Sequence, residues 1–172
     1  FEQDRDRWWG GSFGASGMYR DYVTVGAEAL SPPVVQNSLS GFVLEEFDLT
    51  EVRVQIGARV ESNRYDVEAT DLPDRTFLGV STSLGINVPV GGATNVYANL
   101  TQTYRAPALE ELYNFGPHVG TLTFEVGNPN LERELALGLD AGLKLDAERI
   151  RTEVSGFYYD ISDYVFARLT GE

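Results

Sequence analysis

The sequence predicts an all-β protein folded as an antiparallel up-and-down meander. Apolar and polar residues alternate with a period of two over several long segments, which is the pattern of a strand with one apolar face. The links between these segments are alternately short and long, as in a meander whose turns and loops lie at opposite ends. The composition agrees, because aromatic residues make up 12% of the chain and glycine occurs 18 times, whereas methionine occurs once.

The alternation is strongest in four segments, where we expect strands over residues 52–60, 78–88, 96–104 and 134–146. Residues 52–60 place Val52, Val54, Ile56, Ala58 and Val60 on one face and polar residues or glycine on the other. Residues 134–146 repeat the pattern, with Leu135, Leu137, Leu139, Ala141, Leu143 and Leu145 on the apolar face. Successive side chains of a strand point to opposite faces, so each of these strands has one apolar and one polar side.

Three weaker segments complete a set of seven strands. In residues 11–25, Asp21 interrupts the apolar face. In residues 38–48 the alternation does not show which face of the strand is the apolar one. In residues 149–169 the apolar parity changes between Val154 and Phe157, so we expect a β-bulge near Gly156.

One short helix is predicted inside the longest link, residues 105–133. Pro107 stands where proline is favoured, in the first helical turn. Leu109, Leu112 and Tyr113 follow at helical spacing, and Gly116-Pro117 is expected to stop the helix.

Two architectures fit the alternation: a soluble β-sandwich and an outer-membrane barrel. Long columns of Leu, Val, Ile and Ala favour the barrel, as do aromatic residues near the strand ends. These aromatic residues are Trp8, Trp9, Tyr19, Tyr22, Phe42, Phe47, Tyr104, Tyr158, Tyr159 and Tyr164. In a barrel, the charges facing the lumen would be Arg53, Arg59, Glu61, Glu134, Asp140 and Lys144.

The charge and residue content exclude several classes of function. The formal charge is −13, which repels phosphate backbones and argues against nucleic acid as a partner. Cysteine is absent and His118 is the only histidine, so we expect neither a metal site nor a cofactor. The adjacent carboxylates Glu45 and Glu46 would point to opposite faces of a strand, and no catalytic motif is found, so we expect no enzyme.

A motif in the longest link carries a family resemblance. It consists of Arg105-Ala106-Pro107, then Glu111-Leu112-Tyr113, then Gly127, Asn128, Pro129, Leu131 and Glu134. From residue 96 onward the sequence resembles the TonB-dependent outer-membrane receptors, and Phe157-Tyr158-Tyr159 resembles their next strand. The resemblance implies a bacterial outer-membrane barrel of about 22 strands, of which residues 1–172 would be a partial, internal piece of about seven.

The resemblance also implies partners and a function. Family members enclose an N-terminal plug, which this chain lacks, and draw energy from TonB to take up a scarce nutrient complex. Siderophore-iron, haem, cobalamin and metal are the ligand classes that this implies. The remaining barrel strands and outer-membrane lipid would be further partners, and Arg53, Arg59, Glu61, Asp140 and Lys144 would face the plug. The first residues, Phe1 to Trp9, are not a secretory signal and suggest a piece of a longer chain.

The loop around the motif is the candidate ligand-facing element. Its ligand-facing side chains would be Tyr113, Asn114, Phe115, His118, Phe124 and Glu125. The alternative is a loop that only joins two strands, since Pro107 and Pro129 give it structure without any ligand. At the level of the whole protein, the alternatives are a barrel enzyme or adhesin and a soluble sandwich module.

Overall fold

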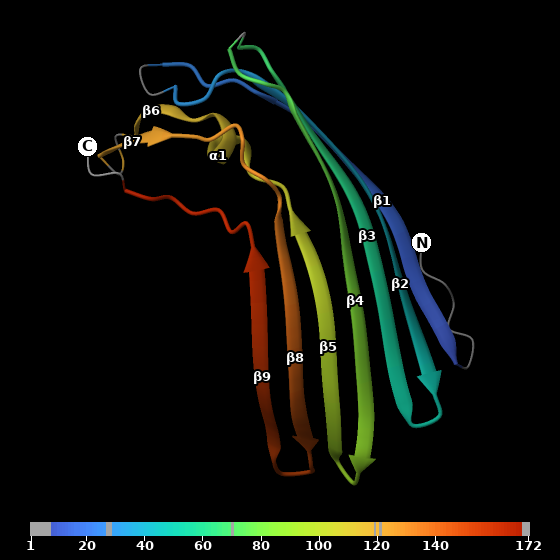
Figure 1. The fold of residues 1–172 in the computed structure, drawn as a ribbon. Helices are drawn as coiled ribbons and strands as arrows, with labels where there is room; N and C mark the ends of the chain where they lie inside the picture. Colours follow the sequence, from blue (N-terminus) through green and yellow to red (C-terminus); the bar gives the residue numbers. More distant parts are fainter. Residues whose placement is uncertain (1–7, 27–28, 70, 119, 121, 170–172) are drawn as a thin grey trace.

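The structure is a computed structural model that describes residues 8–26, 29–69, 71–118, 120 and 122–169. Seven strands form one antiparallel sheet in the order β1-β2-β3-β4-β5-β8-β9 (Figure 1). They are β1 (Trp9–Tyr22), β2 (Val34–Leu49), β3 (Val52–Val67), β4 (Arg75–Gly91), β5 (Thr94–Arg105), β8 (Glu134–Asp146) and β9 (Arg151–Ser162). Helix α1 (Leu109–Tyr113) and a hairpin of β6 (Phe115–His118) and β7 (Thr123–Val126) lie between β5 and β8. The predicted all-β meander is therefore confirmed.

The two ends of the sheet differ as the alternating link lengths predict. The turn end carries the links 50–51, 92–93 and 147–150, and the loop end carries residues 23–33, 68–74 and 106–133. At the turn between β4 and β5, Gly91 and Gly92 adopt φ values of 116° and 58°, which glycine reaches without steric cost. Figure 1 shows α1, β6 and β7 together at the loop end.

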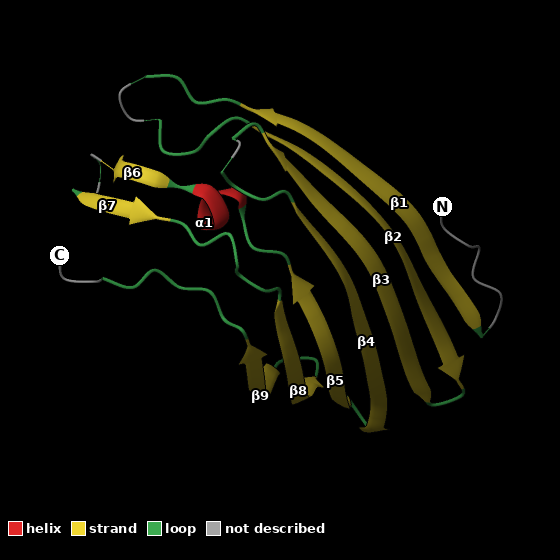
Figure 2. Ribbon diagram, turned by 45° about the horizontal axis from the view of Figure 1, so that its top comes forward, coloured by secondary structure: helices red, strands yellow, loops and turns green. Residues whose placement is uncertain are grey.

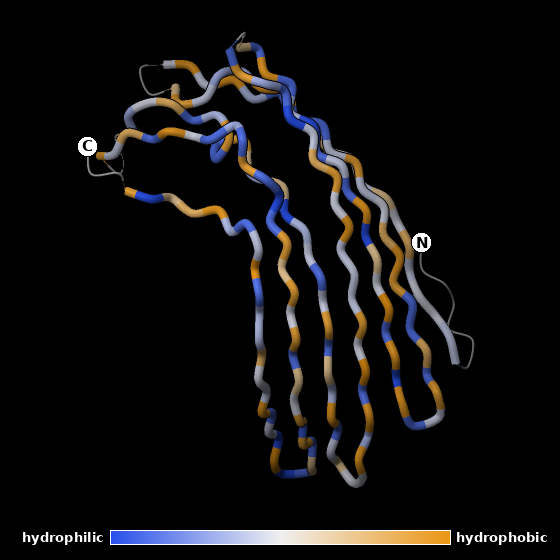
Figure 3. The backbone as a smooth tube through the Cα atoms, in the orientation of Figure 1, coloured by the Kyte–Doolittle hydropathy of each residue, from blue (hydrophilic) through white to orange (hydrophobic). Residues whose placement is uncertain are grey.

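The sheet is curved, and its two faces carry different side chains. Helix α1 lies on the concave side (Figure 2), where Tyr65 and Phe77 pack against it. Residues two apart along a strand share a face, so Gln55, Arg59 and Glu61 lie on the concave face with Tyr65. The opposite, convex face carries the apolar columns, and the alternation is visible along β3 and β8 in Figure 3. Within these columns Ile56 and Leu139 are each 48% exposed.

In the part of the chain that the structure describes, the hydrophobic core lies at the loop end. It consists of Val34, Tyr65, Phe77, Leu109, Leu112 and Tyr113. Elsewhere the sheet is a single layer, and no other described segment covers its apolar convex face. A β-sandwich would bury that face against a second sheet, so this structure does not have the soluble sandwich architecture.

Two predictions about strands are corrected by the pairing register. Strands β8 and β9 pair without interruption from Leu135 with Ser162 to Asp146 with Arg151, so the bulge predicted near Gly156 is wrong. The apolar residues of β9 change parity because they lie on both faces of the strand. Phe157 faces the concave side and pairs with Asp140, whereas Val154 faces the convex side. The ambiguity in residues 38–48 has the same origin, since Phe42 and Leu44 lie on the concave face and Val43 and Phe47 on the convex one.

The helix prediction is confirmed in place but not in its boundaries. Helix α1 begins after Ala108, so Pro107 precedes the helix instead of occupying its first turn. Gly116 and Pro117 do not stop the helix, because they lie inside strand β6. Among the described residues, no helix is long and apolar enough to span a membrane.

The sheet is an open arc, because β1 and β9 each pair with one neighbour. An unpaired strand edge exposes backbone N–H and C=O groups, which lipid does not tolerate. The arc therefore requires further strands on both sides in a membrane, as predicted for a piece of a larger barrel.

Candidate functional site

Helix α1 fixes the long loop 106–133 to the concave wall of the sheet. Leu109 and Leu112 are fully buried against the wall. The Tyr65 hydroxyl donates a hydrogen bond to the Pro107 carbonyl at 2.9 Å, and the Tyr113 hydroxyl donates one to the Pro73 carbonyl at 3.0 Å. Burial raises the pKa of Tyr113 to about 12, so this phenol stays protonated. Tyr113 is thus part of the core and not a ligand-facing side chain.

A charged cluster, here called the Arg105 clamp, joins the two ends of this loop. Arg105 Nε and Nη2 donate to the two carboxylate oxygens of Glu134 at 2.7 and 2.8 Å. Arg105 Nη1 and Nη2 donate to Glu111 at 3.0 and 3.1 Å. Glu111 also accepts a hydrogen bond from the Ala108 amide at 2.7 Å. The clamp therefore connects the end of β5, the start of α1 and the start of β8.

The Gly127-Asn128-Pro129 segment is fastened to α1 as well. The amide of Gly127 donates to the Asn114 carbonyl at 2.6 Å, and the amide of Asn128 donates to the Glu111 carbonyl at 2.9 Å. A side chain at position 127 would place its Cβ within 2.8 Å of the Leu112 carbonyl, so only glycine fits there. The Arg75 guanidinium donates to the carbonyls of Pro129 and Leu131. The residues of the sequence motif thus build a rigid framework for the loop.

This framework presents the β6–β7 hairpin, whose two faces are chemically different. Phe115 pairs with Val126 and Pro117 with Phe124, which puts these four residues on one face. All four are exposed, Phe115 by 69% and Phe124 by 59%, and the two phenyl rings meet edge to face at 5.2 Å. The hairpin projects over the concave side of the sheet (Figures 1 and 2). The alternation of apolar and polar residues does not reveal this hairpin, because its strands have only four residues each and one contains Gly-Pro.

The other face of the hairpin is polar and anchors it. Glu125 accepts hydrogen bonds from Asn114 Nδ2 at 2.8 Å, and its second oxygen lies 2.6 Å from His118 Nδ1. The Ser31 hydroxyl donates to the amide oxygen of Asn114. The amide of Phe115 donates to the Leu30 carbonyl at 2.6 Å. Of the six residues predicted to face a ligand, Asn114, His118 and Glu125 thus form an anchor, whereas Phe115 and Phe124 are exposed.

The anchor should weaken in acid. The hydrogen bonds from Asn114 and His118 hold the pKa of Glu125 below its ordinary value, so the ionised carboxylate stabilises the folded hairpin. This stabilisation is present above the ordinary carboxyl pKa and is lost as the pH falls through the lowered one. We expect hydrogen exchange in residues 122–126 to be faster in Glu125→Gln than in the unmodified protein at neutral pH, and the two rates to converge as the pH falls through the lowered pKa of Glu125. A difference that persists in acid would contradict this, and Glu132→Gln serves as the control.

The concave wall brings together the charges that the sequence assigns to a lumen. Arg53 Nε lies 2.7 Å from Asp48, and Arg59 Nη2 lies 2.6 Å from Glu61. The Tyr159 hydroxyl donates to Asp140 at 2.9 Å. Lys144, on the same face, makes no ion pair or side-chain hydrogen bond within the part of the chain that the structure describes.

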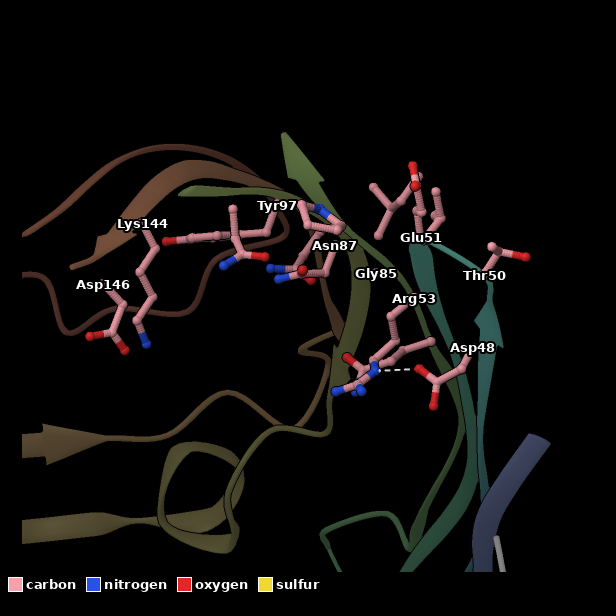
Figure 4. A pocket seen from close by; sticks show the side chains of 15 residues that line it. Asp48, Thr50, Glu51, Arg53, Gly85, Asn87, Tyr97, Lys144 and Asp146 are labelled. Atoms are coloured by element: carbon pink, nitrogen blue, oxygen red, sulfur yellow. Dashed lines mark hydrogen bonds and ion pairs between the residues drawn. The ribbon is translucent and has the colours of Figure 1, made fainter. Parts of the chain in front are cut away.

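A cavity of about 770 Å³ opens on this wall at the turn end. Figure 4 shows Arg53 and Asp48 at one side of it and Lys144 and Asp146 at the other, with Asn87 and Tyr97 between them. Asn95 and Asn99 add further amide groups to its lining. Among the described residues, no group of three or more histidine, aspartate or glutamate side chains is arranged to hold a metal ion.

The whole chain, residues 1–172, matches the family described as TonB dependent receptor-like, beta-barrel. The chain belongs to this family. Among solved structures it is similar to one titled "Copper transporter OprC", with a TM-score of 0.71 and 16% sequence identity. The match covers 91% of this chain and 27% of that transporter, and at this identity it shows the fold.

Membership in the family places the sheet in the bacterial outer membrane. The convex face then meets lipid and the concave face lines the lumen. In outer-membrane barrels the short turns are periplasmic and the long loops extracellular, so the hairpin lies at the outer surface and the cavity of about 770 Å³ at the periplasmic end.

Proposed function

We propose that this chain is part of the barrel wall of a receptor that takes up a scarce nutrient complex across the outer membrane. The remaining strands, a plug and the segment that contacts TonB would belong to parts of the receptor outside residues 1–172. The proposal is supported by the family match, by the open edges of the arc, and by the 27% of the transporter's length that the chain spans. The family and this neighbour are a receptor and a transporter, which favours transport over catalysis.

The observation that carries the proposal is the hairpin held above the lumen. Its apolar face is exposed while the Arg105 clamp and the Asn114–Glu125 anchor fix its position. A rigidly held binding surface loses little conformational entropy when it binds a ligand. The exposed Phe115–Phe124 pair suits a ligand with a large organic surface, so siderophore-iron, haem and cobalamin fit it better than a bare ion.

The lumen charges support a second part of the proposal, contact with a plug. Arg53 and Arg59 already pair with Asp48 and Glu61 of the wall, so neither needs a plug carboxylate. Lys144 has no such wall partner among the described residues and stands beside the periplasmic cavity. We expect Lys144 to be the wall cation that pairs with a plug carboxylate.

The hairpin is tested by removing its aromatic face in the full-length receptor. Phe115→Ala with Phe124→Ala should weaken binding of the transported ligand about tenfold or more, because exposed aromatic anchors dominate such contacts. Affinity is measured on cells for a panel of ferric siderophores, haem, cobalamin and Cu²⁺. Val25→Ala, an exposed residue of another loop, is the control. Unchanged affinity for every ligand would show that the hairpin is only part of a connector.

Two companion measurements separate parts of the proposal. His118→Ala should change affinity only slightly, since its ring is engaged by Glu125, and a large loss would instead indicate metal or haem capture. Removing TonB from the cells should abolish uptake and leave surface binding intact. Uptake that continues without TonB would refute the energy-coupled mechanism.

A further inference from the structure

A carboxylate stands among the apolar residues of the convex face, on strand β2. Glu45 has the parity of Val43 and Phe47, which lie on this face, and it pairs with Ile56 of β3 and with Gly11 of β1. Successive side chains of a strand alternate between the two faces, so Glu45 points to the outside of the barrel. It is therefore separate from the lumen and from the hairpin.

The neighbours of Glu45 place it inside the apolar band. On β3 the apolar column runs from Val52 to Val60, and Ile56, the residue opposite Glu45, is at its centre. With a rise of about 3.3 Å per residue and a tilt of about 40°, that column spans about 20 Å of the membrane. Trp9 and Phe47 form the next row toward the turn end, as expected of interfacial aromatic residues. Glu45 lies on the hydrocarbon side of that row, where a charged side chain that faces lipid destabilises a barrel.

The Glu45 carboxylate leans over β1. The Trp9 indole Nε1 donates a hydrogen bond to Glu45 Oε2 at 2.6 Å. A Cβ atom at position 11 would lie 2.6 Å from the same oxygen and would also collide with the Leu44 carbonyl oxygen, so only glycine fits there. The carboxylate thus occupies the space above Gly11 that a side chain would otherwise fill. It is directed across β1, toward the free edge of the arc.

The charge of Glu45 is not balanced within the part of the chain that the structure describes. There its carboxylate has the hydrogen bond from Trp9 and no ion pair, and an indole N–H is neutral. The free edge of β1 is where a further barrel strand must pair, about 4.8 Å beyond β1 (Figure 1). A lysine or arginine side chain on that strand is long enough to reach a carboxylate above Gly11, since no side chain at position 11 stands between them.

We propose that Glu45 forms an ion pair, across Gly11, with a lysine or arginine on the barrel strand that pairs with the free edge of β1. Charge complementarity in the apolar band and the direction of the carboxylate identify this partner. The ion pair fixes the register of the two strands. A slip of two residues, the smallest that keeps the same face outward, moves the cation by about 7 Å and breaks the pair. The site depends on the outer-membrane location of the chain and not on which nutrient the receptor carries.

The first test is the sign of the change in stability when the carboxylate is removed. For the full-length receptor in lipid vesicles, Glu45→Leu should raise the equilibrium constant of unfolding about tenfold or more, because it leaves the cation without a partner in the apolar band. A carboxylate that faced lipid alone would give the opposite sign, since leucine suits lipid better. The matched control is Thr82→Leu, which removes a polar side chain but no charge from the convex face and should not raise the constant. An unchanged or lower constant in Glu45→Leu would overturn the proposal.

A double-mutant cycle in the full-length receptor identifies the partner. Each outward-facing lysine or arginine of the strand beside β1 is replaced by glutamine, alone and together with Glu45→Gln. At one position the double variant should be little less stable than either single variant, whereas independent residues give additive costs. Exchanging the two charges, with Glu45→Lys and a glutamate at that position, should restore most of the lost stability. Additive costs at every such position, or a strand without an outward-facing lysine or arginine, would overturn the proposal.

A comparison of environments separates a barrel strand from another protein as the source of the cation. The cost of Glu45→Leu should be the same in the purified receptor and in native outer membranes. A cost that appears only in native membranes would assign the cation to a second membrane protein and overturn the assignment to a strand. Nutrient uptake per inserted receptor should be unchanged in Glu45→Gln, so a failure of the uptake proposal and a failure of the ion pair give different results.

Discussion

Replacing Leu139 by Arg is expected to destabilise the inserted barrel by about 2–4 kcal/mol. Leu139 lies near the middle of β8 on the convex face, between Leu100 of β5 and Tyr158 of β9. It is 48% exposed there, so an arginine at this position would face lipid near the middle of the bilayer, and neither cross-strand neighbour is a carboxylate. The measurement is reversible unfolding of the full-length receptor in lipid vesicles by urea or guanidinium.

The control for this experiment is an arginine on the other face. Gln55 faces the lumen and already donates a hydrogen bond to Glu46, so Gln55→Arg keeps a carboxylate partner and should cost little. Ile56 is a poorer choice than Leu139, because Glu45 lies directly opposite it on β2 and would pair with an introduced arginine. A cost near zero for Leu139→Arg would contradict the assignment of the convex face to lipid.

The sequence predicts the strands best where one face is uniformly apolar. The leucine column of residues 134–146 has no interruption, and β8 has the same bounds as the predicted strand. Prediction fails where apolar side chains occupy both faces, as with Phe42 and Val43 of β2 or Phe157 and Tyr158 of β9. A single strand does not reveal which of two apolar faces meets lipid, whereas pairing with a neighbour of clear polarity does.

The candidate sites depend on contacts between distant elements of the chain. The alternation of apolar and polar residues along one strand does not reveal such contacts. The motif indicates a structured loop, but Glu111 and Glu134 meet at Arg105 only because α1 folds back onto the wall. Likewise, the Glu45 carboxylate meets the Trp9 indole and stands above Gly11 only through the register of β1 and β2. Local patterns predict elements, and sites that combine distant elements require the register and the packing.

Replacing Arg105 by Ala is expected to destabilise the receptor by about 2–3 kcal/mol and to loosen the whole outer loop. The guanidinium makes four hydrogen bonds to two carboxylates, and the Glu134 side chain is only 10% exposed. Removing a partner from a fully buried ion pair costs about 3–5 kcal/mol, and the partial exposure of Arg105 and Glu111 lowers the figure here. Urea unfolding measures the cost, and hydrogen exchange in residues 106–118 and 122–133 measures the loosening.

A double-mutant cycle tests whether the clamp is the cause. With Glu134→Gln already present, Arg105→Ala should cost less than it does alone, because the carboxylate left without its cation is then absent. Arg133→Ala, which removes a neighbouring arginine that donates to the Leu78 carbonyl at 2.7 Å, should leave exchange in the hairpin unchanged. Among the described residues, the Arg105 guanidinium bonds to Glu111 and Glu134 and not to the exposed face of the hairpin, so a loss of ligand affinity in Arg105→Ala is expected to act through the position of the hairpin. Additive costs in the cycle would show instead that Arg105 and Glu134 act independently and that the loop is held by the packing of α1 alone.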